Sequence, residues 1–260
     1  MRSERQHRND QSAIKGENME KVICVSNLYK LYRVGDSCVR ALDGVSFDIR
    51  KGEFCAIVGT SGSGKSTLLN MLAGLEKPTK GEVVINGCHI EKLKEDELVR
   101  FRRENVGFIF QSFHLIGTMN AVENVALPLN FRGEARKIRM EKAERMLELV
   151  NLSKHKKHMP NQMSGGQQQR VGVARALVTD PKIIFADEPT GNLDSHTSEE
   201  VMALMQKVVR EQGRTLVMVT HDDHLAEYAD RVFHIIDGKI VKIEENKRKS
   251  KREDLKDDTV

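Results

Sequence analysis

Short apolar runs alternate with segments of helical apolar spacing along most of the chain. Five of these runs are rich in Val, Ile and Phe and have the length of buried strands. The predicted strands are Phe54–Val58, Val83–Ile85, Val106–Phe110, Ile183–Ala186 and Leu216–Val219. Alternation of strands with helices is typical of an α/β fold built on a largely parallel sheet.

The residues before Phe54 follow a different pattern. Three β-type segments occur in quick succession, without room for crossover helices between them: Val22–Val25, Cys38–Leu42 and Val45–Ile49. Parallel strands need such crossovers, whereas antiparallel strands can be joined by tight turns. We therefore expect an antiparallel β subdomain at this end of the chain.

Between about residues 112 and 163 the apolar spacing becomes helical, which predicts an inserted helical subdomain. The spacing is clearest at Ile138, Ala143, Met146, Leu147, Val150 and Leu152. The expected folded region is 21–243. Residues 1–20 are polar and residues 244–260 are highly charged, so both are predicted to be disordered.

Length and composition limit the classes of protein to which the chain can belong. Its 260 residues, 39% hydrophobic and 31% charged, suit one α/β domain. We find no apolar run near the roughly 20 residues of a membrane span and no secretory signal, so we expect a cytoplasmic chain.

The net charge is +4 and both tails are charge-balanced, so no nucleic-acid partner is expected. Four scattered cysteines without a C-x-x-C pair predict reduced thiols.

A glycine-rich loop follows the predicted strand at 54–58 and precedes an apolar helix. It matches G-x-x-x-x-G-K-[ST], and its residues are Gly59, Thr60, Ser61, Gly62, Ser63, Gly64, Lys65, Ser66 and Thr67. A merely flexible Gly/Ser-rich loop is the alternative, but the strand–loop–helix context favours phosphate binding. Backbone N–H groups would face the phosphates, Lys65 would add a positive charge, and Ser66 would ligate Mg²⁺.

Two adjacent carboxylates end the strand that starts at Ile183. Solvated acids at a strand end are the alternative, but the phosphate loop gives the pair a chemical interpretation. Asp187 can hold Mg²⁺ through its second shell, and Glu188 can orient and deprotonate an attacking water.

A second helix start carries the sequence Ser164, Gly165, Gly166, Gln167. Ser164 and Gln167 match the S-x-x-Q capping box, which alone would explain a helix beginning here. Two consecutive glycines are not needed for a cap. They would allow a phosphate to approach the helix N-terminus, which suggests a second anion site.

Together these motifs resemble those of ABC-type ATPases, in order and spacing, over about residues 21–243. The motifs are residues 59–67 (Walker A), Gln111, Ser164–Gln167 (the signature), Asp187–Glu188, Asp194 and His221. The resemblance implies a P-loop NTPase core of the RecA-like class, ATP and Mg²⁺ as ligands, and a head-to-tail homodimer. Each ATP would lie between the Walker A loop of one copy and the signature of the other.

The resemblance also implies roles for single residues. Tyr32 would stack on adenine, with Tyr29 as a competing choice, and Gln111 would reach both Mg²⁺ and the attacking water. Asp194 would couple the two sites, and His221 would contact the γ-phosphate and hold Glu188 in line. The other histidines show no metal-ligand spacing; His155 and His158, in a Lys-rich turn, are expected to be solvated. Asn192 lies in a position that the family fills variably, so it puts little of the resemblance in question.

Several local strings look like the lipoprotein-release and macrolide-export group of this family. They are 39–42 with 45–47, 110–115 and 186–194. That similarity implies a separate integral-membrane permease as partner and a peripheral position on the cytoplasmic face of the membrane, for export or for force transmission across the envelope. A soluble ABC ATPase acting on nucleic acid or ribosomes is the alternative, and a scaffold that binds ATP with little hydrolysis is a third.

Overall fold

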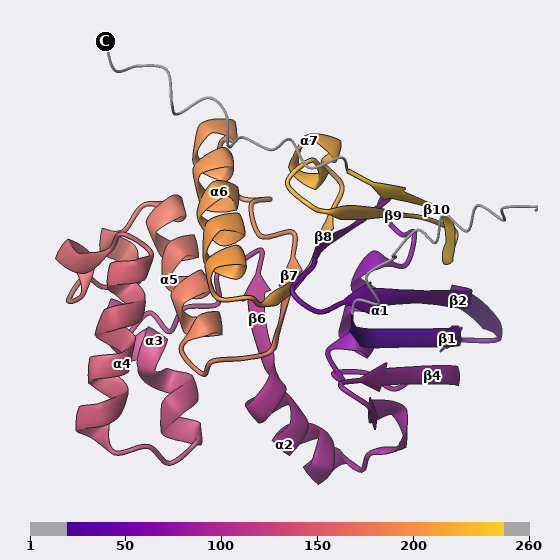
Figure 1. The fold of residues 1–260 in the computed structure, drawn as a ribbon, viewed down its shortest axis with the longest axis horizontal. Helices are drawn as coiled ribbons and strands as arrows, with labels where there is room; N and C mark the ends of the chain where they lie inside the picture. Colours follow the sequence, from indigo (N-terminus) through magenta and orange to yellow (C-terminus); the bar gives the residue numbers. More distant parts are fainter. Residues whose placement is uncertain (1–19, 247–260) are drawn as a thin grey trace, which may run out of the picture.

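The computed structural model describes residues 20–246, which form an α/β fold around a central six-stranded sheet (Figure 1). The strand order is β10-β9-β3-β8-β7-β6; β9 to β6 run parallel, and β10 pairs antiparallel with β9. These strands are β3 (Phe54–Val58), β6 (Val106–Phe110), β7 (Ile183–Asp187), β8 (Thr215–Thr220), β9 (Arg231–Ile236) and β10 (Lys239–Glu245). The predicted parallel sheet is confirmed, and β9 and β10 are additions to it.

Structural elements pack on both faces of this sheet. The helices are α1 (Lys65–Leu72), α2 (Glu95–Asn105), α3 (Ala121–Phe131), α4 (Arg136–Leu149), α5 (Gly165–Leu177), α6 (Ser195–Glu211) and α7 (Asp223–Ala226), with 3₁₀ turns at Ile90–Lys92, Ser153–His155 and Pro160–Gln162. Alternate residues of β3 belong to different cores: Ala56 packs in the core that contains α5 and α6, and Ile57 in the core that contains α1. A strand covered on both faces needs apolar side chains throughout, which explains the unbroken apolar runs.

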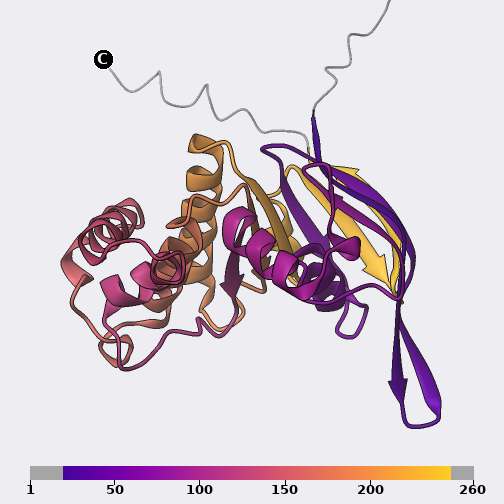
Figure 2. The ribbon, with the colours of Figure 1, turned by 90° about the horizontal axis from the view of Figure 1, so that it is seen from below.

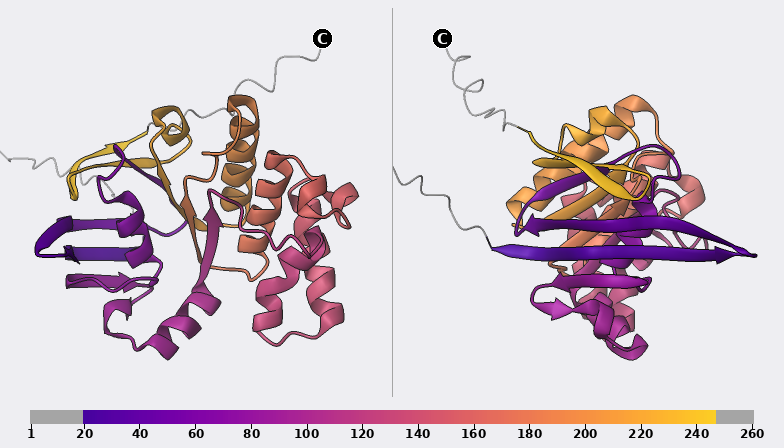
Figure 3. Two further views of the ribbon diagram at one scale, coloured as in Figure 1. Left: turned by 180° about the vertical axis from the view of Figure 1, so that it is seen from behind. Right: turned by 90° about the vertical axis from the view of Figure 1, so that its right-hand side faces the viewer.

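The antiparallel subdomain is a four-stranded sheet of order β2-β1-β4-β5. Its strands are β1 (Lys21–Val34), β2 (Ser37–Arg50), β4 (Lys80–Ile85) and β5 (Cys88–His89). The two predicted segments Cys38–Leu42 and Val45–Ile49 form the single strand β2, which has irregular register opposite β1. The hairpin that joins β1 to β2 extends well beyond the body of the molecule (Figures 2 and 3).

One predicted strand belongs to the other sheet. Val83–Ile85 lies in β4, which pairs antiparallel with β1 and is not part of the central parallel sheet. Ile85 lies opposite Ile23, and the two side chains are fully buried in the same core. An apolar run indicates a strand but not the strand it pairs with, because pairing depends on the side chains against which the run packs in the folded core.

The region 112–163 contains α3 and α4, and α5 packs against both. Ala143 and Leu147 of α4 are buried, whereas Ile138, one of the positions in the predicted helical spacing, is 50% exposed. No helix within residues 20–246 is both long and apolar enough to cross a bilayer.

At the end of the described chain, β10 runs to Glu245, two residues beyond the predicted boundary. Glu244 pairs with Val232 of β9, and its Oε2 lies 3.1 Å from Nε2 of His234. The predictions of disorder for 1–20 and 244–260 otherwise concern residues 1–19 and 247–260, which lie outside the described residues.

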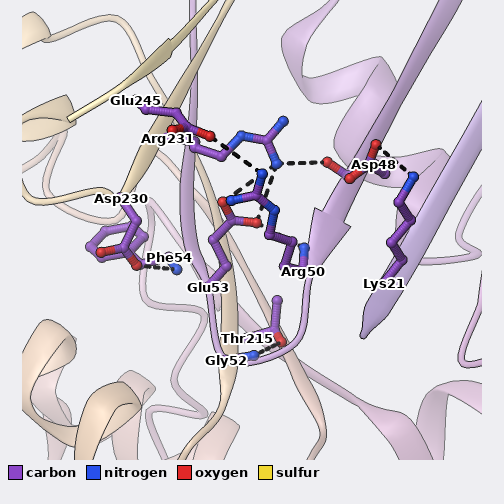
Figure 4. A network of polar contacts seen from close by, with 10 residues as sticks. All are labelled: Lys21, Asp48, Arg50, Gly52, Glu53, Phe54, Thr215, Asp230, Arg231 and Glu245. Carbon is purple, nitrogen blue, oxygen red and sulfur yellow. Dashed lines mark hydrogen bonds and ion pairs between the residues drawn. The ribbon is translucent and has the colours of Figure 1, made fainter. Parts of the chain in front are cut away.

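A buried ion pair at the edge of the central sheet is hydrogen-bonded to the antiparallel sheet (Figure 4). Arg231, at the start of β9, is 8% exposed, and Glu53, next to β3, is 7% exposed. Nη1 of Arg231 lies 3.4 Å from each carboxylate oxygen of Glu53 and donates a hydrogen bond to the carbonyl of Asp48 on β2. The carboxylate of Glu53 also accepts from the backbone N–H of Arg50. This network fixes the antiparallel sheet against the strand that leads to the glycine-rich loop.

Candidate functional site

The glycine-rich loop 59–67 connects β3 to α1. Gly64 caps α1 with φ of +100°, and a β-carbon at this position would overlap the carbonyl oxygen of Ala41. Only glycine fits such a left-handed, closely packed position. The ammonium of Lys65 donates to the carbonyls of Gly59 and Thr60, both at 2.8 Å. The loop therefore holds its cation in place at the N-terminus of a helix, which is suited to bind phosphate.

Ser66 and Asp187 meet at the carboxyl end of β7. The Ser66 hydroxyl lies 3.2 Å from Oδ1 of Asp187. Burial raises the pKa of the Asp187 carboxyl and the charge of Glu188 adds to the increase, while the Ser66 hydrogen bond and Lys65 oppose it. A hydroxyl and a partly desolvated carboxylate this close together are oxygen ligands of the kind that Mg²⁺ prefers.

The carboxylate of Glu188 is paired with the imidazole of His221. Nδ1 of His221 lies 3.0 Å from Oε1 of Glu188. Glu188 has φ of +44°, and its N–H donates to the carbonyl of Val219 on β8. A left-handed backbone at a non-glycine residue is a strained conformation of the kind that gathers at functional sites. Together with Gly191 and other residues, both side chains line a cavity of 550 Å³.

Gln111 lies beside the loop that follows Glu188. Phe110, the residue before it, pairs with Asp187 across β6 and β7. The side-chain amide of Gln111 packs so closely on Gly191 that a β-carbon there would lie 2.7 Å from Nε2. Asn192 donates from Nδ2 to the Gln111 carbonyl at 3.1 Å. Asn192 thus fixes the backbone of a candidate catalytic residue.

The Ser164–Gln167 turn forms both halves of the predicted capping box. The Ser164 hydroxyl accepts from the Gln167 N–H at 3.3 Å, and Oε1 of Gln167 accepts from the Ser164 N–H at 3.0 Å. The structure gives Gly166 a second reason to be glycine, because a β-carbon would overlap the γ-methyl of Thr197 on α6. Gly166 therefore allows α5 to pack closely on α6, whether or not a phosphate approaches this turn.

The glycine-rich loop and the Ser164–Gln167 turn start helices on opposite faces of the central sheet. α1 packs in the core on one face and α5 in the core on the other. Figure 1 shows α1 and α5 on opposite sides of β6 and β7. The two candidate anion sites of one chain therefore start helices that cover opposite faces of its sheet.

Tyr32 adjoins the end of the glycine-rich loop. Its hydroxyl donates to Oε2 of Glu76 at 2.7 Å and also interacts with Thr67. Burial raises its pKa, and the hydrogen bond to Glu76 contributes to the increase. The competing candidate, Tyr29, lies next to Gly44, with the Lys80 ammonium 5.7 Å from its ring centroid. Of the two tyrosines, Tyr32 is the one in contact with the glycine-rich loop.

Asp194 caps α6. Its carboxylate accepts from the N–H of Thr197 at 3.0 Å, and hydrogen bonds from the hydroxyl and the backbone of Thr197 lower its pKa. Asp194 is exposed, so its side chain remains accessible. The structure thus gives Asp194 a local capping role; its role in coupling two sites remains a prediction.

Comparison with known proteins identifies the family. A family model described as "ABC transporter" matches residues 42–191. The chain belongs to this family. It is 48% identical over 222 residues to the uncharacterized ABC transporter ATP-binding protein MJ1508 of Methanocaldococcus jannaschii, covering 85% of this chain and 99% of that protein. It is also 48% identical over 220 residues to the macrolide export ATP-binding/permease protein MacB of Chlorobaculum tepidum, covering 85% of this chain.

The chain spans about a third of the macrolide export proteins that it matches, 34% in the case above. Among solved structures it is similar to the ATP-binding cassette MJ0796 of M. jannaschii, described as a dimer in a post-hydrolysis state bound to ADP and Pi. The TM-score is 0.80 at 43% identity, covering 86% of this chain and 99% of that one. The predicted fold class is confirmed, and the chain is an ABC-type ATPase domain with an ATP-binding cassette.

Proposed function

We propose that this ABC ATPase works as a head-to-tail pair, in which two ATP molecules are enclosed between the cassettes and their hydrolysis drives a separate membrane permease. The observation that carries the proposal is that the two candidate anion sites start helices on opposite faces of the central sheet. We propose that the Ser164–Gln167 turn that meets a nucleotide on the glycine-rich loop belongs to a second copy. The MJ0796 cassette, described as a dimer with ADP and Pi, supports a pair of cassettes.

The residues at the ends of β3, β6 and β7 suit a nucleotide with Mg²⁺. The Ser66 hydroxyl and the Asp187 carboxylate, 3.2 Å apart, would hold the ion, with Gln111 from the neighbouring strand. When bound, Mg²⁺ neutralises charge on the β- and γ-phosphates. Lys65 binds the same phosphates, for which it would exchange its contacts with the loop carbonyls. Tyr32 would stack on the adenine next to the loop.

The pair Glu188 and His221 suits activation of water. Oε1 of Glu188 is engaged by Nδ1 of His221, which leaves Oε2 to accept a proton from the attacking water. His221 thereby fixes the direction in which the carboxylate points, and its other nitrogen can contact the γ-phosphate. Asp194, exposed at the start of α6, would couple the two sites across the dimer.

The permease is proposed from the macrolide export relatives. These relatives are described as ATP-binding/permease proteins, and this chain matches about a third of their length. We propose that a separate integral-membrane subunit supplies the permease function and that the cassettes bind it at the cytoplasmic face of the membrane. Closure of the pair would then drive export or transmit force across the envelope.

The test of the dimer is sizing chromatography of the Glu188→Gln variant with ATP. This substitution keeps the shape of the side chain but removes the base, so we expect a stable ATP-bound dimer. The same variant with Lys65→Ala added should remain monomeric. A Glu188→Gln protein that stays monomeric at saturating ATP contradicts the head-to-tail pair.

The test of the permease is co-purification of the tagged chain from detergent-solubilised membranes, followed by mass spectrometry. We expect an integral-membrane protein with an extracytoplasmic domain. Recovery of soluble nucleic-acid-binding proteins alone would contradict the permease proposal and leave the ATPase assignment unchanged.

A further inference from the structure

His155 is not a solvated histidine, contrary to the expectation from its Lys-rich sequence. Its Nε2 lies 3.2 Å from Nε2 of Gln167, the last residue of the signature turn. Its Nδ1 is buried and has no hydrogen-bond partner among the described residues. The ring also packs on His158, with 5.0 Å between the ring centroids.

The capping box determines the direction of this hydrogen bond. Oε1 of Gln167 accepts from the N–H of Ser164, so the Gln167 nitrogen that faces His155 is an NH₂ group, which can only donate. Nε2 of His155 must therefore be the acceptor, and the proton of the neutral ring is on the buried Nδ1. Among the described residues, the contact with Gln167 is therefore the hydrogen bond that this imidazole makes.

His155 also connects the signature turn to another part of the helical region. It ends the 3₁₀ turn at Ser153–His155, and the segment that follows is bonded to the start of α3. The Ala121 N–H donates to the His158 carbonyl and the Val122 N–H to the Lys156 carbonyl. The imidazole thus links a backbone segment anchored on α3 to the side chain that closes the cap of α5.

We infer that His155 is a positioning residue for the signature turn: by accepting a hydrogen bond from Gln167, it holds the start of α5 in the form that receives the nucleotide of a partner cassette. The inference rests on the proposed head-to-tail pair. Without the acceptor, one of the two contacts that orient the Gln167 amide is lost, and the N–H of Ser164 loses a fixed partner. His155 acts through Gln167 and need not touch nucleotide itself.

Two substitutions of His155 separate this role from simple packing. His155→Gln keeps an oxygen acceptor near the position of Nε2, whereas His155→Leu fills the space without an acceptor. His158→Leu is the matched control, because it changes the neighbouring ring and leaves the Gln167 contact intact. All three are made in the Glu188→Gln background, and the monomer–dimer dissociation constant with ATP is measured by analytical ultracentrifugation.

We expect His155→Leu to weaken the ATP-dependent dimer about tenfold, the effect of losing one hydrogen bond to a fixed group. ATP binding by the monomer should stay within about twofold, since the Walker A loop lies on the other face of the sheet. His155→Gln and His158→Leu should dimerise like the parent. Equal weakening by His155→Leu and His155→Gln, or no weakening by either, overturns the inference.

Amide hydrogen exchange of the monomer tests the contact without the dimer. We expect His155→Leu, but not His155→Gln, to speed exchange at Ser164 and Gln167, the two amides whose acceptors belong to the capping box. Unchanged exchange in His155→Leu overturns the inference. If the parent does not dimerise but exchange responds as expected, the head-to-tail pair is wrong and the positioning contact stands.

Discussion

Nδ1 of His221 lies 3.0 Å from Oε1 of Glu188, although the two residues are 33 positions apart in the chain. The parallel pairing of β7 with β8 makes this possible, because both side chains follow the carboxyl ends of adjacent strands. Catalytic groups in open α/β sheets collect at such ends. The His221–Glu188 pair therefore depends on the register of two neighbouring strands.

Replacing His221 by Ala should lower kcat for ATP about 100-fold or more, because Glu188 loses the group that directs its carboxylate. ATP binding should change by less than threefold. Steady-state phosphate release and equilibrium nucleotide binding measure the two effects. His224→Ala, in the wall of the same cavity, is the control and should retain kcat. A His221→Ala enzyme with parental kcat contradicts the proposed mechanism.

Lys65→Ala should weaken ATP binding by about 10-fold to more than 100-fold, the range expected for loss of charge-assisted hydrogen bonds to phosphate. Fluorescent-nucleotide titration measures the change. Lys51→Ala, at the opposite end of β3, is the matched control for loss of one positive charge. Because Lys65 also bonds two loop carbonyls, thermal unfolding must show that the variant is folded. Unchanged affinity would exclude the loop as the phosphate site.

Gly166→Ala should destabilise the domain by about 1–3 kcal/mol, since the new β-carbon overlaps the γ-methyl of Thr197. Adding Thr197→Ser removes that methyl and keeps the hydroxyl, so the double variant should regain most of the stability in urea unfolding. If the single variant is as stable as the parent, packing against α6 is not the reason for glycine here.

Recovery of ATP-dependent dimerisation in the same double variant distinguishes two roles of Gly166. If dimerisation returns together with stability, packing against Thr197 explains the glycine. If stability returns and dimerisation does not, the nucleotide of the partner also needs the open space at this turn.

Arg231→Met should destabilise the domain by about 3–5 kcal/mol, because it leaves the buried carboxylate of Glu53 without its cation. Adding Glu53→Leu removes that unpaired charge and should recover a large part of the loss. Chemical denaturation of the two single variants and the double variant gives the coupling. Simple additivity of the two substitutions would show that the pair does not act as a unit.

Asp187→Asn should stabilise the fold while impairing Mg²⁺-dependent hydrolysis. Burial raises the pKa of the Asp187 carboxyl in the folded protein. Folding with this carboxyl charged therefore costs free energy, and the full cost is present at any pH above the folded pKa. The uncharged amide avoids that cost, and because solvent screens the partly exposed carboxyl we expect a gain of less than about 1 kcal/mol. The gain should shrink as pH falls and the native carboxyl becomes protonated. A less stable variant at neutral pH contradicts this account.

Much of the site could be predicted because its chemistry is encoded in short segments. The glycine-rich loop needs a strand, a turn and a helix that are contiguous from Phe54 to Leu72, so the spacing of glycines and Lys65 is enough to identify it. The capping box of α5 is local in the same way, with both partners within four residues. Buried strands were visible because two-sided burial requires uninterrupted apolar runs.

Contacts between distant segments could not be predicted, because sequence carries no direct signal for them. The apolar run Val83–Ile85 is compatible with a strand in either sheet. Its pairing with β1, where Ile85 lies opposite Ile23, places it in the antiparallel sheet. Asn192 and His155 look unremarkable in sequence, since their partners Gln111 and Gln167 are brought to them by the fold.

The sequence by itself therefore determined the family and predicted the phosphate loop and the adjacent carboxylates Asp187 and Glu188, since each depends on residue types at fixed local spacing. Only the tertiary structure decided that Gly166 faces Thr197, that His221 reaches Glu188, and that the helices after the two candidate anion sites cover opposite faces of one sheet. The physical reason is that packing and strand register set these distances, and both result from burying the whole core at once.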